Sequence, residues 1–89
     1  MRAVVTVTGK DRTGIIAKVS SFLAERNANI EDISQTVMGE YFAMIMIVDI
    51  SGANAEVSAL AKECETLGKQ IGMSIYVQHE DIFNAMHNV

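Results

Sequence analysis

One short polar loop of this chain holds the residue types that could bind an anion, and it lies directly after a β-like segment. The loop is GKDRTG, residues 9–14, which places Asp11 and Arg12 between two glycines. This glycine spacing matches half of a phosphate-binding P-loop, which continues with a lysine and a serine or threonine that hold phosphate and magnesium. Ile15 and Ile16 occupy those positions here. The loop is therefore not expected to bind a nucleotide phosphate.

Nucleophiles and metal ligands are sparse elsewhere in the sequence. Cys64 falls on the apolar side of a helical stretch, where a free cysteine usually acts as a small core residue. His79 and His87 have no cysteine or further histidine at a spacing that would complete a metal site. We therefore expect no metal, no cofactor and no catalytic residue. The alternative is an enzyme, a small acyl phosphate hydrolase, which would use Arg12 together with one of the several asparagines.

Composition restricts the class of protein further. With 49% hydrophobic and 20% charged residues, the 89-residue chain is typical of a soluble globular domain. Its net charge of −4 argues against nucleic acid, whose binding begins with a basic surface. No apolar run approaches the ~20 residues of a membrane span, and the first residues lack the features of a secretory signal. We therefore expect a cytoplasmic protein that binds neither nucleic acid nor membrane.

The spacing of apolar residues predicts the elements that position the loop. Period-2 and period-3.6 patterns alternate along the chain, in the order strand, helix, strand, strand, helix, strand. The predicted ranges are 3–8, 14–26, 29–38, 41–50, 57 to about 68–72, and 73–78. This order is that of the split β-α-β arrangement. Because crossovers are right-handed, we predict an α+β, ferredoxin-like sandwich with two helices on one face of a four-stranded antiparallel sheet, strand order 4-1-3-2.

Three local features are also predicted. Asp11 or Thr13 is suited to cap the first helix, because either side chain can accept hydrogen bonds from the first turn. Ile30 and Ile33 have opposite parity in the second strand, so we expect a bulge between them, near residues 31–32. The Gly-Glu pair at residues 39–40 favours a type II′ hairpin turn.

The C-terminal residues and the third strand both leave apolar surface without a partner. Residues 80–89 place apolar side chains at helical spacing behind an acidic start, which predicts a short terminal helix. The third strand, 41–50, is apolar on both faces, although a sheet with helices on one side should be polar on the other. The terminal helix, a second subunit, or both are candidates to cover that face, and we expect a homodimer.

The whole pattern resembles the ACT domain family of small-molecule-binding regulatory modules. The resemblance rests on GKDRTGI between the first strand and helix, and on NANI at the opening of the second strand. The chain looks like the short, free-standing ACT proteins related to the repressor of the glycine cleavage system. It implies a single domain over residues 1–89, with a core at 1–79 and a helical extension at 80–89.

The family resemblance implies a non-catalytic homodimer that binds an amino acid, or another small ligand, between subunits and signals through a partner protein. By motif, the ligand-binding residues are Asp11, Arg12, Gly14, Ile15, Asn29 and Ile30. The start of the first helix can hold a carboxylate, with Arg12 adding a fork, while Asp11 can accept from an ammonium group. A ligand-free structural dimer stays as an alternative, in which Asp11 only caps the helix and Gly14 only permits close packing.

Overall fold

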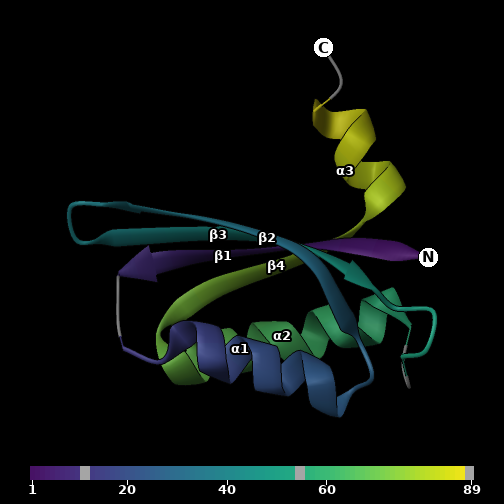
Figure 1. Cartoon of the computed structure of the whole chain (residues 1–89), viewed down its shortest axis with the longest axis horizontal. Coiled ribbons are helices and arrows are strands. Elements are labelled where there is room, and N and C mark those ends of the chain that lie inside the picture. The colour runs from purple at the N-terminus through teal and green to yellow at the C-terminus, as the bar shows by residue number, and fades with distance from the viewer. Residues whose placement is uncertain (11–12, 54–55, 88–89) are drawn as a thin grey trace.

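The computed structural model describes residues 1–10, 13–53 and 56–87 (Figure 1). The elements are β1 (Arg2–Lys10), α1 (Ile15–Glu25), β2 (Asn29–Met38), β3 (Tyr41–Asp49), α2 (Val57–Ile71), β4 (Met73–His79) and α3 (Glu80–His87). Their order confirms the predicted arrangement, including the terminal helix. None of the helices in these described ranges has both the length and the apolar character needed to cross a membrane.

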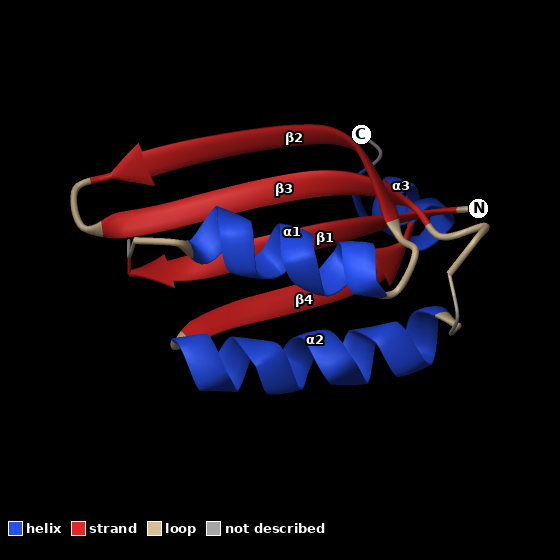
Figure 2. Cartoon of the chain, turned by 60° about the horizontal axis from the view of Figure 1, so that its bottom comes forward, coloured by secondary structure: helices blue, strands red, loops and turns tan. Residues whose placement is uncertain are grey.

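The strands form one antiparallel sheet in the order β2-β3-β1-β4, which confirms the predicted topology. Helices α1 and α2 lie side by side on one face of this sheet (Figures 1 and 2). Strand β1 is paired on both sides, and its Ala3, Val5 and Val7 are buried under the helices. The opposite face of the sheet, which α1 and α2 do not cover, is called the open face below.

Helix α1 begins differently from the prediction and ends as predicted. Its N-cap is Gly14, in the left-handed region at φ 84°, and Thr13 forms no cap. The predicted cap Asp11 lies outside the described residues. A left-handed cap favours glycine because a Cβ is disfavoured there. At the other end, Asn27 is also left-handed, and the amides of Asn27 and Ala28 donate to the carbonyls of Ala24 and Leu23. This pair of bonds is a Schellman motif, with asparagine in the usual place of glycine.

Strand β2 contains the predicted bulge. Ile30 pairs with Val48 and Asp32 with Ile47, so Glu31 is the extra residue. The bulge places Ile30 and Ile33 on the same face despite their opposite parity. At the far end, a two-residue loop joins β2 to β3, and Gly39 has φ 62°, as the first position of a type II′ turn requires.

The core lies between the sheet and the two helices. Strand β3 contributes a continuous row of buried side chains to it: Phe42, Met44, Met46 and Val48. Leu23 of α1 and Leu60 of α2 pack on that row, and Cys64 is buried as predicted. A Cβ at Gly68 would lie 2.5 Å from the Met73 carbonyl oxygen, so the absence of a side chain lets α2 approach β4 closely.

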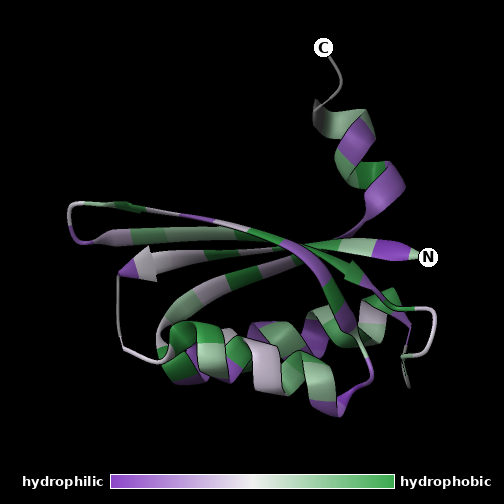
Figure 3. Cartoon of the chain, viewed as in Figure 1, coloured by the Kyte–Doolittle hydropathy of each residue, from purple (hydrophilic) through white to green (hydrophobic). Residues whose placement is uncertain are grey.

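Helix α3 does not lie across the open face. It rises from the end of β4 and stands away from the sheet, while α1 and α2 lie on the other side (Figure 1). Figure 3 shows both hydrophobic and hydrophilic segments on α3. Ile82 and Met86 are 55% and 64% exposed, and Ile45 in the middle of the open face is 42% exposed. The apolar open face predicted from β3 is therefore mostly uncovered within one chain.

Candidate functional site

The loop half of the candidate site is built on the start of α1. Lys18 N donates to Gly14 O at 3.0 Å in the first turn. The amides of residues 15–17 precede this bond, so they have no acceptor within the helix and can donate to an anion. A Cβ at Gly14 would meet nothing within 4 Å, so this glycine does not serve close packing between helix and sheet. Its left-handed φ and the open space around it fit a backbone that a ligand can approach.

Ile15 contributes to this half through its backbone alone. Its side chain is 4% exposed and belongs to the core, so it fixes the first turn of α1 on the sheet. The predicted contact of Ile15 with a ligand is therefore limited to the amide N–H. Asp11 and Arg12, the charged residues of the loop, lie outside the described residues.

The strand half of the candidate site starts β2. Asn29 is exposed and pairs in register with Asp49, while Ile30 is half-buried opposite Val48. Asp49 accepts a hydrogen bond from Ser51 N at 2.8 Å, and this bond is the main cause that lowers the pKa of the Asp49 carboxyl. An anionic carboxylate therefore lies beside Asn29. The sequence analysis missed it because the neighbour relation comes from strand register.

Arg2 adds a cation to the same end of the open face. In the sheet register it pairs with Asp49, which makes it a neighbour of the strand half. Its guanidinium lies 2.7 Å from Glu80 and 3.7 Å from Glu31, and the hydrogen bond that it donates to Glu80 is the main cause that raises its pKa. The strand half thus offers an amide, a carboxylate and a fixed guanidinium within a few residues.

One chain does not bring the two halves together. Gly14 precedes α1 and Asn29 follows it, and an 11-residue helix is about 16 Å long. Figure 2 shows β2 starting near the C-terminal end of α1, away from the first turn of that helix. The two halves can share one ligand only when a second copy places its strand half beside the loop half of the first.

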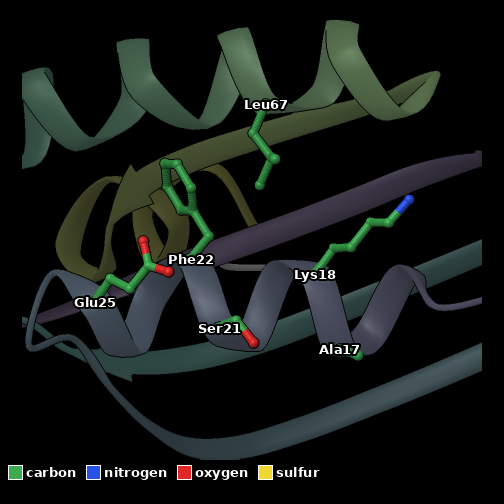
Figure 4. Close-up of a pocket in the computed structure, with 6 residues that line it drawn as sticks. All are labelled: Ala17, Lys18, Ser21, Phe22, Glu25 and Leu67. Carbon is green, nitrogen blue, oxygen red and sulfur yellow. The ribbon is translucent and has the colours of Figure 1, made fainter.

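A separate groove between α1 and α2 was not predicted from the sequence. It has a volume of about 400 Å³, and Figure 4 shows Phe22 and Leu67 pointing toward each other from the two helices. Lys18 and Glu25 line it further along α1. Next to it, the Arg26 guanidinium lies 3.5 Å from the Phe22 ring centroid. The groove is open to solvent and holds no buried polar group that would fix the orientation of a ligand.

The sequence and the fold match known proteins closely. The model of the ACT domain family matches residues 2–78. The UPF0237 protein MK1213 of Methanopyrus kandleri is 57% identical over 88 residues, which are 99% of this chain and 98% of that protein. The solved structure of an ACT domain protein from Streptococcus pneumoniae has a TM-score of 0.84 and 44% identity, and the match covers 98% of each chain.

These matches show which class of protein the chain belongs to. The architecture is a ferredoxin-like α+β sandwich of the regulatory ACT type, shared over nearly the whole chain. The chain belongs to the ACT domain family. The structure of a candidate glycine cleavage system transcriptional repressor is also similar, with a TM-score of 0.75 over 89% of this chain and 47% of that one. At 23% identity, that likeness is one of fold.

Proposed function

We propose that this protein is a non-catalytic, cytoplasmic regulatory module that works as a homodimer, binds an amino acid between two copies and signals through a partner protein. The observation that carries the proposal is the start of α1. There, Gly14 is left-handed, a Cβ would meet nothing within 4 Å, and the amides of the first turn have no acceptors within the helix. Backbone amides at a helix start suit the α-carboxylate of an amino acid.

The second half supplies what the ammonium group of the same ligand needs. Asn29 offers an amide oxygen as acceptor, and Asp49 beside it offers a carboxylate whose lowered pKa keeps it anionic. A zwitterion needs donors at one end and acceptors at the other. Since these groups lie at opposite ends of α1 in one chain, the proposal requires that the two halves come from different copies.

The split site also explains how binding can be transmitted. A ligand that contacts two copies binds the associated state more tightly than the separate chains, so it shifts the association equilibrium. Coupling between such a ligand and a partner protein is typically ~1–3 kcal/mol. Regulation then passes by association, without chemistry in this chain.

A thermal-shift scan of the full chain against the twenty amino acids tests the proposal. A ligand at about 100 times its Kd adds ~2.7 kcal/mol of stability, which raises the Tm of a small domain by roughly 10 °C. A shift confined to one chemical class of amino acid is the expected result. A flat scan would contradict ligand binding and leave the ligand-free dimer.

Variants then locate the site. Asn29→Ala should weaken binding of any amino acid found by about tenfold or more, and Asp11→Ala with Asn29→Ala should abolish it, while the molecular mass in solution stays unchanged. Gln70→Ala, an exposed amide on α2, is the matched control and should bind like the wild type. Equal affinity of Asn29→Ala and wild type would remove the strand half from the site.

A further inference from the structure

The centre of the open face is free of charge across all four strands. Two adjacent rows of cross-strand neighbours make up this centre: Ser34, Ile45, Thr6 and Tyr76, then Thr36, Ala43, Thr8 and Ser74. Ile45 is 42% exposed and Tyr76 is 60% exposed. We call these eight residues the floor. Such a surface can be removed from water without desolvating a charge, and its serine, threonine and tyrosine hydroxyls need hydrogen-bond partners across the contact.

One lysine and one aspartate border the floor at its opposite ends. Lys10, opposite Tyr41, lies at the end near the hairpin, and Asp32, opposite Ile47, lies at the end near α3. In the described part of the chain, neither Lys10 nor Asp32 forms an ion pair. In a two-fold contact each residue pair occurs twice, so reversing one copy over another places both Lys10 side chains near Asp32 of the other copy.

Helix α3 forms a wall at the Asp32 end of the floor. Ile82 and Met86 are four residues apart and share one side of the helix. Gln78, on the open face, donates through Nε2 to Met86 Sδ at 3.1 Å, so this apolar side of α3 borders the open face. The base of the wall is held by the 2.7 Å ion pair between Arg2 and Glu80.

The area of the floor and of the exposed side of α3 suits contact with a second copy of the same chain. Four strands about 4.8 Å apart and nine residues long at about 3.3 Å each give a face of roughly 19 by 30 Å. With the exposed side of α3 added, the surface approaches the ~800 Å² that each partner buries in a standard stable interface. We propose that a second copy of the chain covers the open face, floor against floor, with α3 of each copy packed beside the sheet of the other.

This contact is separate from the ligand site proposed above. It uses Ile45, Tyr76 and the Ile82 side of α3, whereas the ligand site uses the start of α1 and Asn29. Loss of the floor contact therefore lowers the molecular mass, while failure of the ligand proposal leaves that mass unchanged and appears only in the thermal-shift scan.

Sedimentation of the full chain at micromolar concentration, in low salt, tests the contact. The wild type should have at least twice the 9.7 kDa mass of one chain. Ile45→Lys places a charge at the middle of the floor and should weaken association by about tenfold or more. Ala59→Lys puts the same charge on the exposed surface of α2, as a matched control, and should leave the mass unchanged. Circular dichroism verifies that both variants are folded.

Two further variants test the geometry. Ile82→Asp should also weaken association by about tenfold, because α3 packs on the other copy. Lys10→Glu and Asp32→Lys should each weaken it, and their combination should restore it, because the pair is reversed together. A monomeric wild type, or an Ile45→Lys variant that associates like the wild type, would overturn the proposal. An Ile82→Asp variant with unchanged association would overturn the role of α3, and failed charge rescue would overturn the two-fold arrangement.

Discussion

The guanidinium of Arg26 lies 2.9 Å from the carboxylate of Glu63, and this ion pair ties the end of α1 to the middle of α2. Both Nε and Nη2 reach the same oxygen, Oε2, while Nη1 donates to the Phe22 carbonyl at 3.0 Å. The guanidinium also covers the Phe22 ring. One residue thus caps a helix, forms an ion pair and stacks on an aromatic ring.

Arg26→Ala should destabilise the chain by about 1–3 kcal/mol, because it removes a charge-assisted hydrogen bond and a cation–π contact that are partly shielded from water. Arg26→Lys should recover only part of the lost stability, since an ammonium group cannot present the paired N–H donors of the guanidinium to Glu63. Urea unfolding of Arg26→Ala, Glu63→Ala and the double variant measures the coupling, expected near 1 kcal/mol. Strict additivity of the two single losses would show that the ion pair contributes nothing.

Gly68→Ala should destabilise the chain although alanine is the better helix former. The added Cβ would lie 2.5 Å from the Met73 carbonyl oxygen, so α2 has to move away from β4. Overpacking of this kind costs about 1–3 kcal/mol, which outweighs the ~1 kcal/mol gained in helix propensity. Gly52→Ala is the control, because its nearest neighbour is 3.8 Å away, and it should change stability by about 0.5 kcal/mol or less. Equal Tm values for the two variants would contradict the close contact.

Cys64 should react slowly with thiol reagents in the folded protein. Burial raises the pKa of its thiol from an ordinary 9.0 to about 11, and the side chain is 2% exposed. The reactive thiolate is therefore scarce near neutral pH, and labelling should proceed only as fast as the chain opens. Labelling as rapid in buffer as in denaturant would place the thiol at the surface.

The raised pKa of Cys64 also makes the free energy of unfolding fall as the pH becomes alkaline. The folded state holds the Cys64 proton more tightly than the unfolded state, so this stabilisation is complete below pH 9.0 and is lost as pH rises toward about 11. Unfolding free energies over this range should fall more steeply for the wild type than for Cys64→Ala, which lacks the titrating group. Parallel curves for the two proteins would rule out the contribution of Cys64.

Deletion of Glu31 should be tolerated. Ile30 and Asp32 already pair with adjacent residues of β3, so removing the bulged residue leaves a regular ladder, and the cost should be about 1 kcal/mol or less. Deletion of Thr6 is the contrasting control. Strand β1 is paired on both sides without a bulge, so that deletion turns buried side chains outward and should unfold the chain. Circular dichroism distinguishes the two, and an unfolded Glu31 deletion would contradict the bulge assignment.

Local patterns predicted most of the fold, because each depended on neighbours in sequence. The parity change from Ile30 to Ile33 indicated the bulge, and the topology followed from element order and crossover handedness. The N-cap of α1 is Gly14 in a left-handed conformation and not Thr13, one of the two caps that polar side chains predicted, while Asp11, the other, lies outside the described residues. No sequence pattern indicated the Arg26–Glu63 pair, whose members are 37 residues apart.

The candidate site was predictable in its parts only. The sequence motif selected Gly14 and Asn29, and the structure explains what each can offer, but it leaves them at opposite ends of α1. A single ligand could contact both only with a second copy of the chain, as the family resemblance implies. Asp49 lies beside Asn29 only because the register of β2 and β3 pairs them. The upright position of α3 follows from contacts such as the ion pair between Arg2 and Glu80.

The position of β1 in the middle of the sheet has a consequence for synthesis on the ribosome. Ala3 pairs with Val48 on one side and with His79 on the other, so the first strand made must wait for the last one. Until β4 leaves the ribosome, one edge of β1 and the β4 side of α2 have no partner. Contacts of such long sequence separation slow folding, so the sheet is completed only after nearly the whole chain has emerged.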